Sequence, residues 1–110
     1  MTGHTVNIEK LNKENFDTWK LQIGAILIKN DHWAYVNGTK PAPELEIAED
    51  NVTNAAEIEA WETADQKARA DIILAMSPSE LCHIKHCTTS NEVWRKLEEV
   101  YHSRGMVNRA

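Results

Sequence analysis

The sequence contains few of the residues that build turns and cross-links. It has four Gly, three Pro and two Cys among 110 residues. Because a fold of many strands needs turn residues at short intervals, this shortage disfavours a many-stranded β fold. The two Cys are close neighbours in the sequence and do not make a disulfide framework. With 42% hydrophobic and 26% charged residues, the composition is typical of one globular domain.

Targeting and membrane-spanning segments are also missing. The first residues, Met-Thr-Gly-His-Thr-Val-Asn, lack the apolar core of a signal peptide. The longest apolar run, from Leu21 to Ile28, is interrupted by a Gln and a Gly and is far shorter than the ~20 residues that span a bilayer. We therefore expect a cytoplasmic protein without a membrane partner.

No catalytic or cofactor motif is present. The four Gly stand alone, so the chain has no Gly-rich phosphate loop. It has neither a His-Glu-x-x-His pair nor a Gly-x-Ser-x-Gly elbow. We predict that the chain is not an enzyme, with no catalytic residues, no cofactor and no small-molecule substrate.

Residues 82–87, Cys-His-Ile-Lys-His-Cys, are the one segment that concentrates metal ligands. On a helix Cys82 would neighbour His86, and His83 would neighbour Cys87, and zinc prefers these side chains. However, zinc sites take their two ligand pairs from separate turns, and ligands this close in sequence cannot surround one ion. We predict no metal site and a structural or surface role, with a two-residue site completed by another chain as the alternative.

The net charge of −5 is concentrated in the middle of the chain. Residues 41–76 carry two Lys/Arg and nine Asp/Glu, whereas the segments on either side are close to neutral. An acidic middle is not the pattern of a nucleic-acid-binding protein. Direct RNA binding is an alternative that would need a basic face. The cations that could form it are Lys85, Arg95, Lys96, Arg104 and Arg109.

Helical periodicity and capping signals predict an all-α fold, a compact bundle of about five helices. After a short extended piece at residues 1–10, the first helix runs from an N-cap at Asn15 to Lys29. A short second helix is expected to be capped by Asp31 and to stop at Asn37-Gly38.

The later helices have capping motifs of their own. The third and longest begins at Asn54, paired with Glu57, and continues to Met76. Ser77-Pro78 begins a fourth helix, and Thr89 with Glu92 begins a fifth. Residues 39–53 form an acidic loop that contains Pro, and no hairpin is predicted there. Residues 1–110 are expected to form a single domain.

The core is predicted around Trp19, Trp61 and Trp94, which lie on long apolar stripes, with Trp33 nearer the edge. Asp65 lies inside one of these stripes and needs a hydrogen-bond donor or a cation when buried. We expect it to join helices by binding a Trp indole, a helix N-terminus or an Arg. The predicted core comprises Phe16, Trp19, Ile23, Leu27, Trp61, Asp65, Ala68, Ile72, Trp94, Leu97 and Tyr101.

The first helix is apolar on two sides. Besides its core side, Leu21, Ala25 and Ile28 form a second strip on roughly the opposite side. Either other helices of the same chain cover this strip, or a second copy of the protein does. The three residues are therefore a candidate self-association site.

The order of these features resembles a known family. Leu11-Asn-Lys-Glu-Asn-Phe16 followed by Thr18-Trp-Lys20 is similar to the opening of the Gag protein of copia-type LTR retrotransposons. The resemblance continues through Trp61-x-x-x-Asp65, Ser77-Pro-Ser-Glu-Leu81 and Leu97-Glu-x-Val100-Tyr101. It covers about residues 8 to 105.

The resemblance implies an N-terminal capsid-type domain that self-assembles into a virus-like particle. Its partners would be other copies, with a dimer in isolation, and the rest of Gag. RNA would be bound only indirectly, because the Cys-x2-Cys-x4-His-x4-Cys zinc knuckle of such proteins is absent. The alternative is a domesticated Gag-derived host protein that acts as a binding adaptor or as an inhibitor of a related element.

Overall fold

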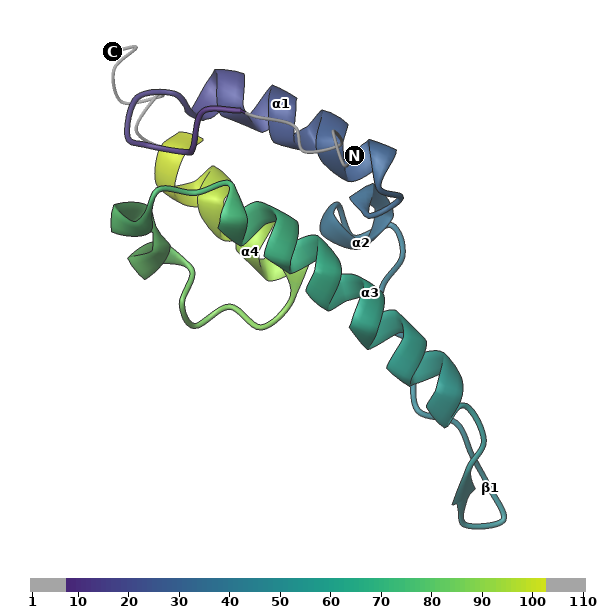
Figure 1. Cartoon of the computed structure of the whole chain (residues 1–110). Helices are drawn as coiled ribbons and strands as arrows, with labels where there is room; N and C mark the ends of the chain where they lie inside the picture. Colours follow the sequence, from purple (N-terminus) through teal and green to yellow (C-terminus); the bar gives the residue numbers. More distant parts are fainter. Residues whose placement is uncertain (1–7, 103–110) are drawn as a thin grey trace.

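The computed structural model describes residues 8–102 and is mostly helical, as predicted (Figure 1). A 3-10 helix, η1, follows the third α-helix, and a π-helical turn, η2, continues the fourth. The elements, in chain order, are α1 (Phe16–Lys29), α2 (Trp33–Val36), β1 (Ile47–Ala48), β2 (Asn51–Val52), α3 (Ala55–Leu74), η1 (Pro78–His83), α4 (Ser90–Leu97) and η2 (Glu98–His102). Most of the predicted extended piece, residues 1–7, lies outside the described residues.

The four α-helices form a bundle in which α2 and α3 are central. The short α2 contacts both α3 and α4, α3 packs on α4, and α1 contacts α2 and α3. Figure 1 shows that the N-terminal half of α3 extends away from the other helices and carries the β1–β2 hairpin at its end. The structure is therefore a helical bundle with one projecting arm.

Trp19 of α1 lies at the centre of the core. Its side chain is 1% exposed, and its ring centroid lies 6.3 Å from that of Trp94. The indole Nε1 donates a 2.8 Å hydrogen bond to the carbonyl oxygen of Ala75, just beyond the end of α3. The amide nitrogen of Leu11 donates to the same carbonyl at 2.9 Å. These bonds attach α1 and the segment before it to the end of α3.

One predicted core residue, Trp61, lies outside the central cluster, whereas Trp33, predicted nearer the edge, is partly buried against it. Trp19 and Trp94 are buried as predicted, but Trp61 is only partly buried and packs on Tyr35, outside the central cluster. Trp33 instead meets the ring of Trp94 edge-on at 5.3 Å and packs against the core. The reason is that Trp61 belongs to the N-terminal half of α3, which extends away from the other helices in Figure 1, so the apolar stripe of α3 continues beyond the core. The other predicted core residues are buried.

The capping box at the start of α4 is confirmed, but the one at α3 is not. Thr89 Oγ1 accepts from the amide of Glu92 at 3.1 Å, and Glu92 Oε1 accepts from the amide of Thr89 at 3.4 Å. Asn54 precedes α3, yet its side chain does not cap the helix. It accepts from the amide of Glu46 and donates to the carbonyl of Glu44 instead. These bonds close residues 44–54 into a hairpin where a loop was predicted.

The other predicted N-caps occupy different roles. Asn15 stands before α1, but its side chain accepts from the amide of Asn12 at 2.8 Å and organises the preceding turn. The residue before α2 is His32, and Asp31, with a φ of 62°, forms the turn between the two helices. Ser77 precedes η1 without a side-chain cap. Local capping signals therefore located the helix starts better than they predicted the bonds made there.

Candidate assembly surface

The second apolar strip of α1 faces away from the core. Leu21 is 77% exposed, Ile28 is 60% exposed, and Ala25 between them is also exposed. No part of the chain that the structure describes covers these side chains. Of the two alternatives drawn from the sequence, burial of the strip by the same chain is therefore excluded for residues 8–102.

Gly24 lies on the same strip, three residues after Leu21 and four before Ile28. A Cβ atom built at Gly24 would meet no atom within 4 Å. Neither a crowded neighbour nor a left-handed backbone requires glycine there, although glycine inside a helix costs about 1 kcal/mol relative to alanine. The strip therefore has a shallow centre between two large apolar side chains, which the packing of this chain does not explain.

The strip is held in place from the inner side of α1. Lys20 Nζ and Glu98 Oε2 form a 2.8 Å ion pair that links α1 to η2. The ring of Phe16 stacks on that of Tyr101 with centroids 5.2 Å apart. Together with the Trp19 indole bond, these contacts fix the rotation of α1 about its axis. The outer strip is thus presented by a rigid helix.

Asp65 performs the structural role expected from the sequence. It is 3% exposed and accepts hydrogen bonds from the amide of Ser90, at 3.2 Å, and from the hydroxyl of Ser90, at 2.5 Å. Ser90 is the first residue of α4, where the helix dipole favours a negative charge. Of the three predicted partners, the helix N-terminus is the one confirmed, and Asp65 joins α3 to α4.

Glu80 is a buried carboxylate whose position the sequence did not reveal. It is 1% exposed, and its oxygens accept from Lys13 Nζ at 2.8 Å and from the hydroxyl of Tyr101. The hydrogen bond from Lys13 lowers the pKa of Glu80 from 4.5 to about 2; Tyr101 adds to this effect, and burial opposes it. In the sequence, Glu80 is the third residue after Ser77, the spacing of a helix-start signal, and this local motif gives no sign of its burial. Glu80 ties η1 to η2 and to the segment before α1.

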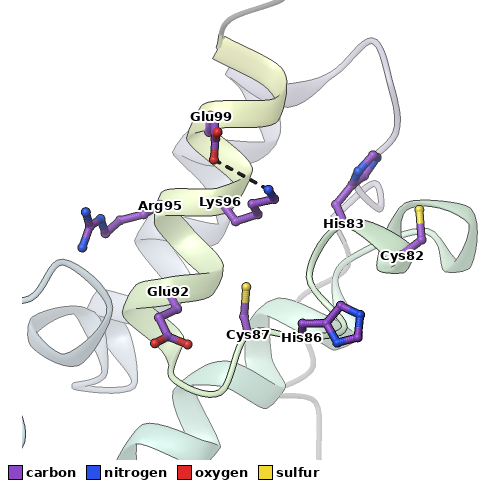
Figure 2. Close-up of a pocket in the computed structure, with 8 residues that line it drawn as sticks. All are labelled: Cys82, His83, His86, Cys87, Glu92, Arg95, Lys96 and Glu99. Atoms are coloured by element: carbon purple, nitrogen blue, oxygen red, sulfur yellow. Dashed lines mark ion pairs between the residues drawn. The ribbon is translucent and has the colours of Figure 1, made fainter.

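The Cys- and His-containing segment borders a groove of about 810 Å³ beside α4 (Figure 2). The groove is lined by Cys82, His83, His86, Cys87, Glu92, Arg95, Lys96 and Glu99. In Figure 2 the side chains of Cys82 and Cys87 lie apart and do not point toward one another, and the His86 ring is turned to the side. Among residues 8–102, no three His, Cys, Asp or Glu side chains are placed to hold a metal ion.

Two features of the groove define its chemistry. Burial raises the pKa of the Cys87 thiol; the nearby Glu92 carboxylate adds to this effect, and Lys96 and Arg69 oppose it. Arg95 and Lys96 extend to different sides of α4 in Figure 2, and Lys96 pairs with Glu99 at 3.7 Å. Arg104 and Arg109 lie outside the described residues.

Within residues 8–102, no helix is both long and apolar enough to cross a membrane.

Comparisons with known proteins connect the chain to retrotransposons. A model of the family described as "gag-polypeptide of LTR copia-type" matches residues 23–110. The chain is 26% identical over 110 residues to "Retrovirus-related Pol polyprotein from transposon TNT 1-94" of Nicotiana tabacum, with 99% of this chain and 8% of that protein covered. It is 25% identical over 96 residues to "Retrovirus-related Pol polyprotein from transposon RE2" of Arabidopsis thaliana, with 86% and 7% covered. The chain thus spans less than a tenth of the length of these relatives. No solved structure matches it.

Proposed function

We propose that the helical bundle is a structural assembly module. The chain belongs to the gag-polypeptide family of copia-type LTR retrotransposons, and this membership is the basis of the proposal. In this proposal the module contributes contacts between copies to a virus-like particle and catalyses no reaction. The family match supports a gag role, and the exposed strip of α1 supplies a surface for contact between copies.

The observation that carries the proposal is the composition and exposure of the α1 strip. Leu21, Gly24, Ala25 and Ile28 follow the spacing of one helix face, and none of them is charged. An uncharged strip can meet its own copy across a two-fold axis without like-charge repulsion. A patch of exposed apolar side chains on one side of a rigid helix is typical of a surface that binds another protein.

The geometry favours an antiparallel pair of α1 helices. Around the midpoint between Gly24 and Ala25, a two-fold axis would place Leu21 of one copy beside Ile28 of the other. The small residues at the crossing would let the two backbones approach closely. Two large side chains per copy bury much less than the ~1,200 Å² of a stable interface, so this contact alone gives a weak dimer. Because a two-fold contact closes into a dimer, a particle shell would combine it with at least one other contact between copies.

The test is Ile28→Lys, with Gln22→Lys as the matched control. Gln22 is exposed on α1 but lies to one side of the strip. Light scattering across a range of concentrations should show a weak dimer for the parent and the Gln22 variant, and a monomer for Ile28→Lys. Circular dichroism should show the same helix content in all three, because both positions are exposed. A folded Ile28→Lys protein with unchanged mass at every concentration would overturn the proposed interface.

A further inference from the structure

The β1–β2 hairpin has a largely exposed apolar face that is not part of the core cluster of residues 8–102. Ile47 pairs directly with Val52, so their side chains share one face of the hairpin. Leu45 lies two residues before Ile47, just outside β1. These side chains are 60%, 46% and 59% exposed respectively. A two-stranded hairpin is only marginally stable in isolation, so an uncovered apolar face on one calls for an explanation.

The hairpin is held firmly at its base. Asn54 is 7% exposed, donates to the carbonyl of Glu44 at 2.7 Å and accepts from the amide of Glu46 at 3.0 Å. Nearby, the indole of Trp61 donates to the carbonyl of Lys40 at 2.8 Å. These bonds attach both ends of the segment to α3. The apolar face is therefore preorganised, which lowers the entropy cost of binding.

The negative charge of the chain is concentrated in the segment that carries this face. We define the acidic arm as residues 44–62, the hairpin with the first two turns of α3, which extends beyond the bundle in Figure 1. It carries seven of the chain's 17 Asp/Glu and none of its 12 Lys/Arg. The seven are Glu44, Glu46, Glu49, Asp50, Glu57, Glu59 and Glu62. Outside the arm, cations outnumber carboxylates, so the arm is the source of the net charge of −5.

Two acidic residues occupy the tip despite an unfavourable backbone. Glu49 and Asp50 have φ values of 53° and 68° and form the turn between the strands. Such turns favour Asn-Gly, because a left-handed conformation costs an ordinary residue roughly 1–2 kcal/mol. The arm thus keeps carboxylates at its exposed end where turn stability alone would favour other residues.

We propose that the acidic arm is a docking surface for a basic segment of another protein in which apolar side chains alternate with Lys or Arg. The apolar side chains would cover Leu45, Ile47 and Val52, and the cations would be attracted by the net negative charge of the arm. A second arm is disfavoured as the occupant by like-charge repulsion, and nucleic acid is disfavoured by its phosphates. This inference concerns a surface separate from the α1 strip and does not depend on the proposed assembly role.

The test measures binding of two synthetic peptides to the full 110-residue chain by fluorescence anisotropy. One peptide alternates Lys with Leu, and the other alternates Lys with Ser at the same length and charge. The Lys/Leu peptide should bind at least tenfold more tightly, with an affinity that falls as salt is raised. The double variant Ile47→Ser, Val52→Ser should lose this tenfold preference at unchanged charge. Leu74→Ser, which removes a side chain that is 74% exposed elsewhere on α3, should retain it.

Three results would overturn the proposal. Equal binding of both peptides would show attraction by charge alone, without an apolar docking face. Binding of neither peptide would exclude this partner chemistry. A parent dimer that the Ile47→Ser, Val52→Ser variant abolishes would identify a second copy as the occupant. The Ile28→Lys variant separates this test from the proposed function, because it should bind the Lys/Leu peptide as the parent does.

Discussion

Gly24 offers a sharp test of how the α1 strip is used. In the single chain, the Cβ of an alanine at this position would meet no atom within 4 Å. The variant Gly24→Ala therefore gains helix propensity without a clash, about 0.8–1 kcal/mol. For a domain of this size, that gain raises Tm by about 4–6 °C. Thermal unfolding followed by circular dichroism at low protein concentration measures this effect on the monomer.

The variant Gly24→Leu then tests the contact between copies. Leucine also favours the helix, and it enlarges the apolar strip between Leu21 and Ile28. If the strip associates through its apolar area alone, the larger area should strengthen association. If two α1 helices cross closely at Gly24, the added side chain should hold them apart and weaken it. Because the proposed antiparallel pair places Gly24 at the crossing, we expect weaker association, measured by sedimentation equilibrium.

The direction of the change in Tm for Gly24→Ala, and in association for Gly24→Leu, decides whether these two predictions hold. A lower Tm for Gly24→Ala at low concentration would contradict the open space beside Gly24. Stronger association of Gly24→Leu would contradict a close crossing and leave only a nonspecific apolar patch. Gln22→Leu, an apolar addition to one side of the strip, is the matched control and should leave association unchanged.

Two further predictions concern the interior. Glu80, whose pKa is lowered to about 2, stabilises the fold above its ordinary pKa of 4.5, and this stability should be lost as the pH falls from about 4.5 toward 2. In denaturant unfolding, Glu80→Gln should lower the free energy of unfolding by about 2–3 kcal/mol at pH 7. Below pH 4.5, the free energy of unfolding of this variant should change less with pH than that of the parent. Parallel pH profiles for the two proteins would contradict this role of Glu80. Trp19→Ala should cost about 3–5 kcal/mol and Trp61→Ala only about 1–2 kcal/mol, because Trp61 is partly exposed. Equal losses in chemical denaturation would place Trp61 in the core after all.

The features predicted best from the sequence are those that periodicity within one helix determines. The inward side of α1, with Trp19, and its outward strip, with Leu21, are where the pattern placed them. The Thr89–Glu92 capping box was also predictable, because both of its bonds are made within four residues. In each case the information lies inside a single turn or a single helix face.

The failures occur where a residue's role depends on distant parts of the chain. The stripe that contains Trp61 is helical and apolar, but periodicity does not say where the packing partner ends. Asn54 has the sequence of an N-cap, yet its side chain closes the hairpin against Glu44 and Glu46. The hairpin turn uses Glu49-Asp50 in place of the usual Asn-Gly, so its signal was missing. Glu80 is matched to Lys13, 67 residues away, and no local pattern indicates that pairing.

The contacts that hold α1 also support the proposed role of its outer strip. The fold holds α1 entirely from its inner side, through the Trp19 indole bond to Ala75 and the ion pair between Lys20 and Glu98. Removing Leu21 or Ile28 would therefore take no contact from the core of the described chain. Exposed leucine and isoleucine add nothing to the stability of a monomer, and Gly24 lowers it. A helix face that costs stability in the single chain is accounted for when its contacts are made with a second molecule.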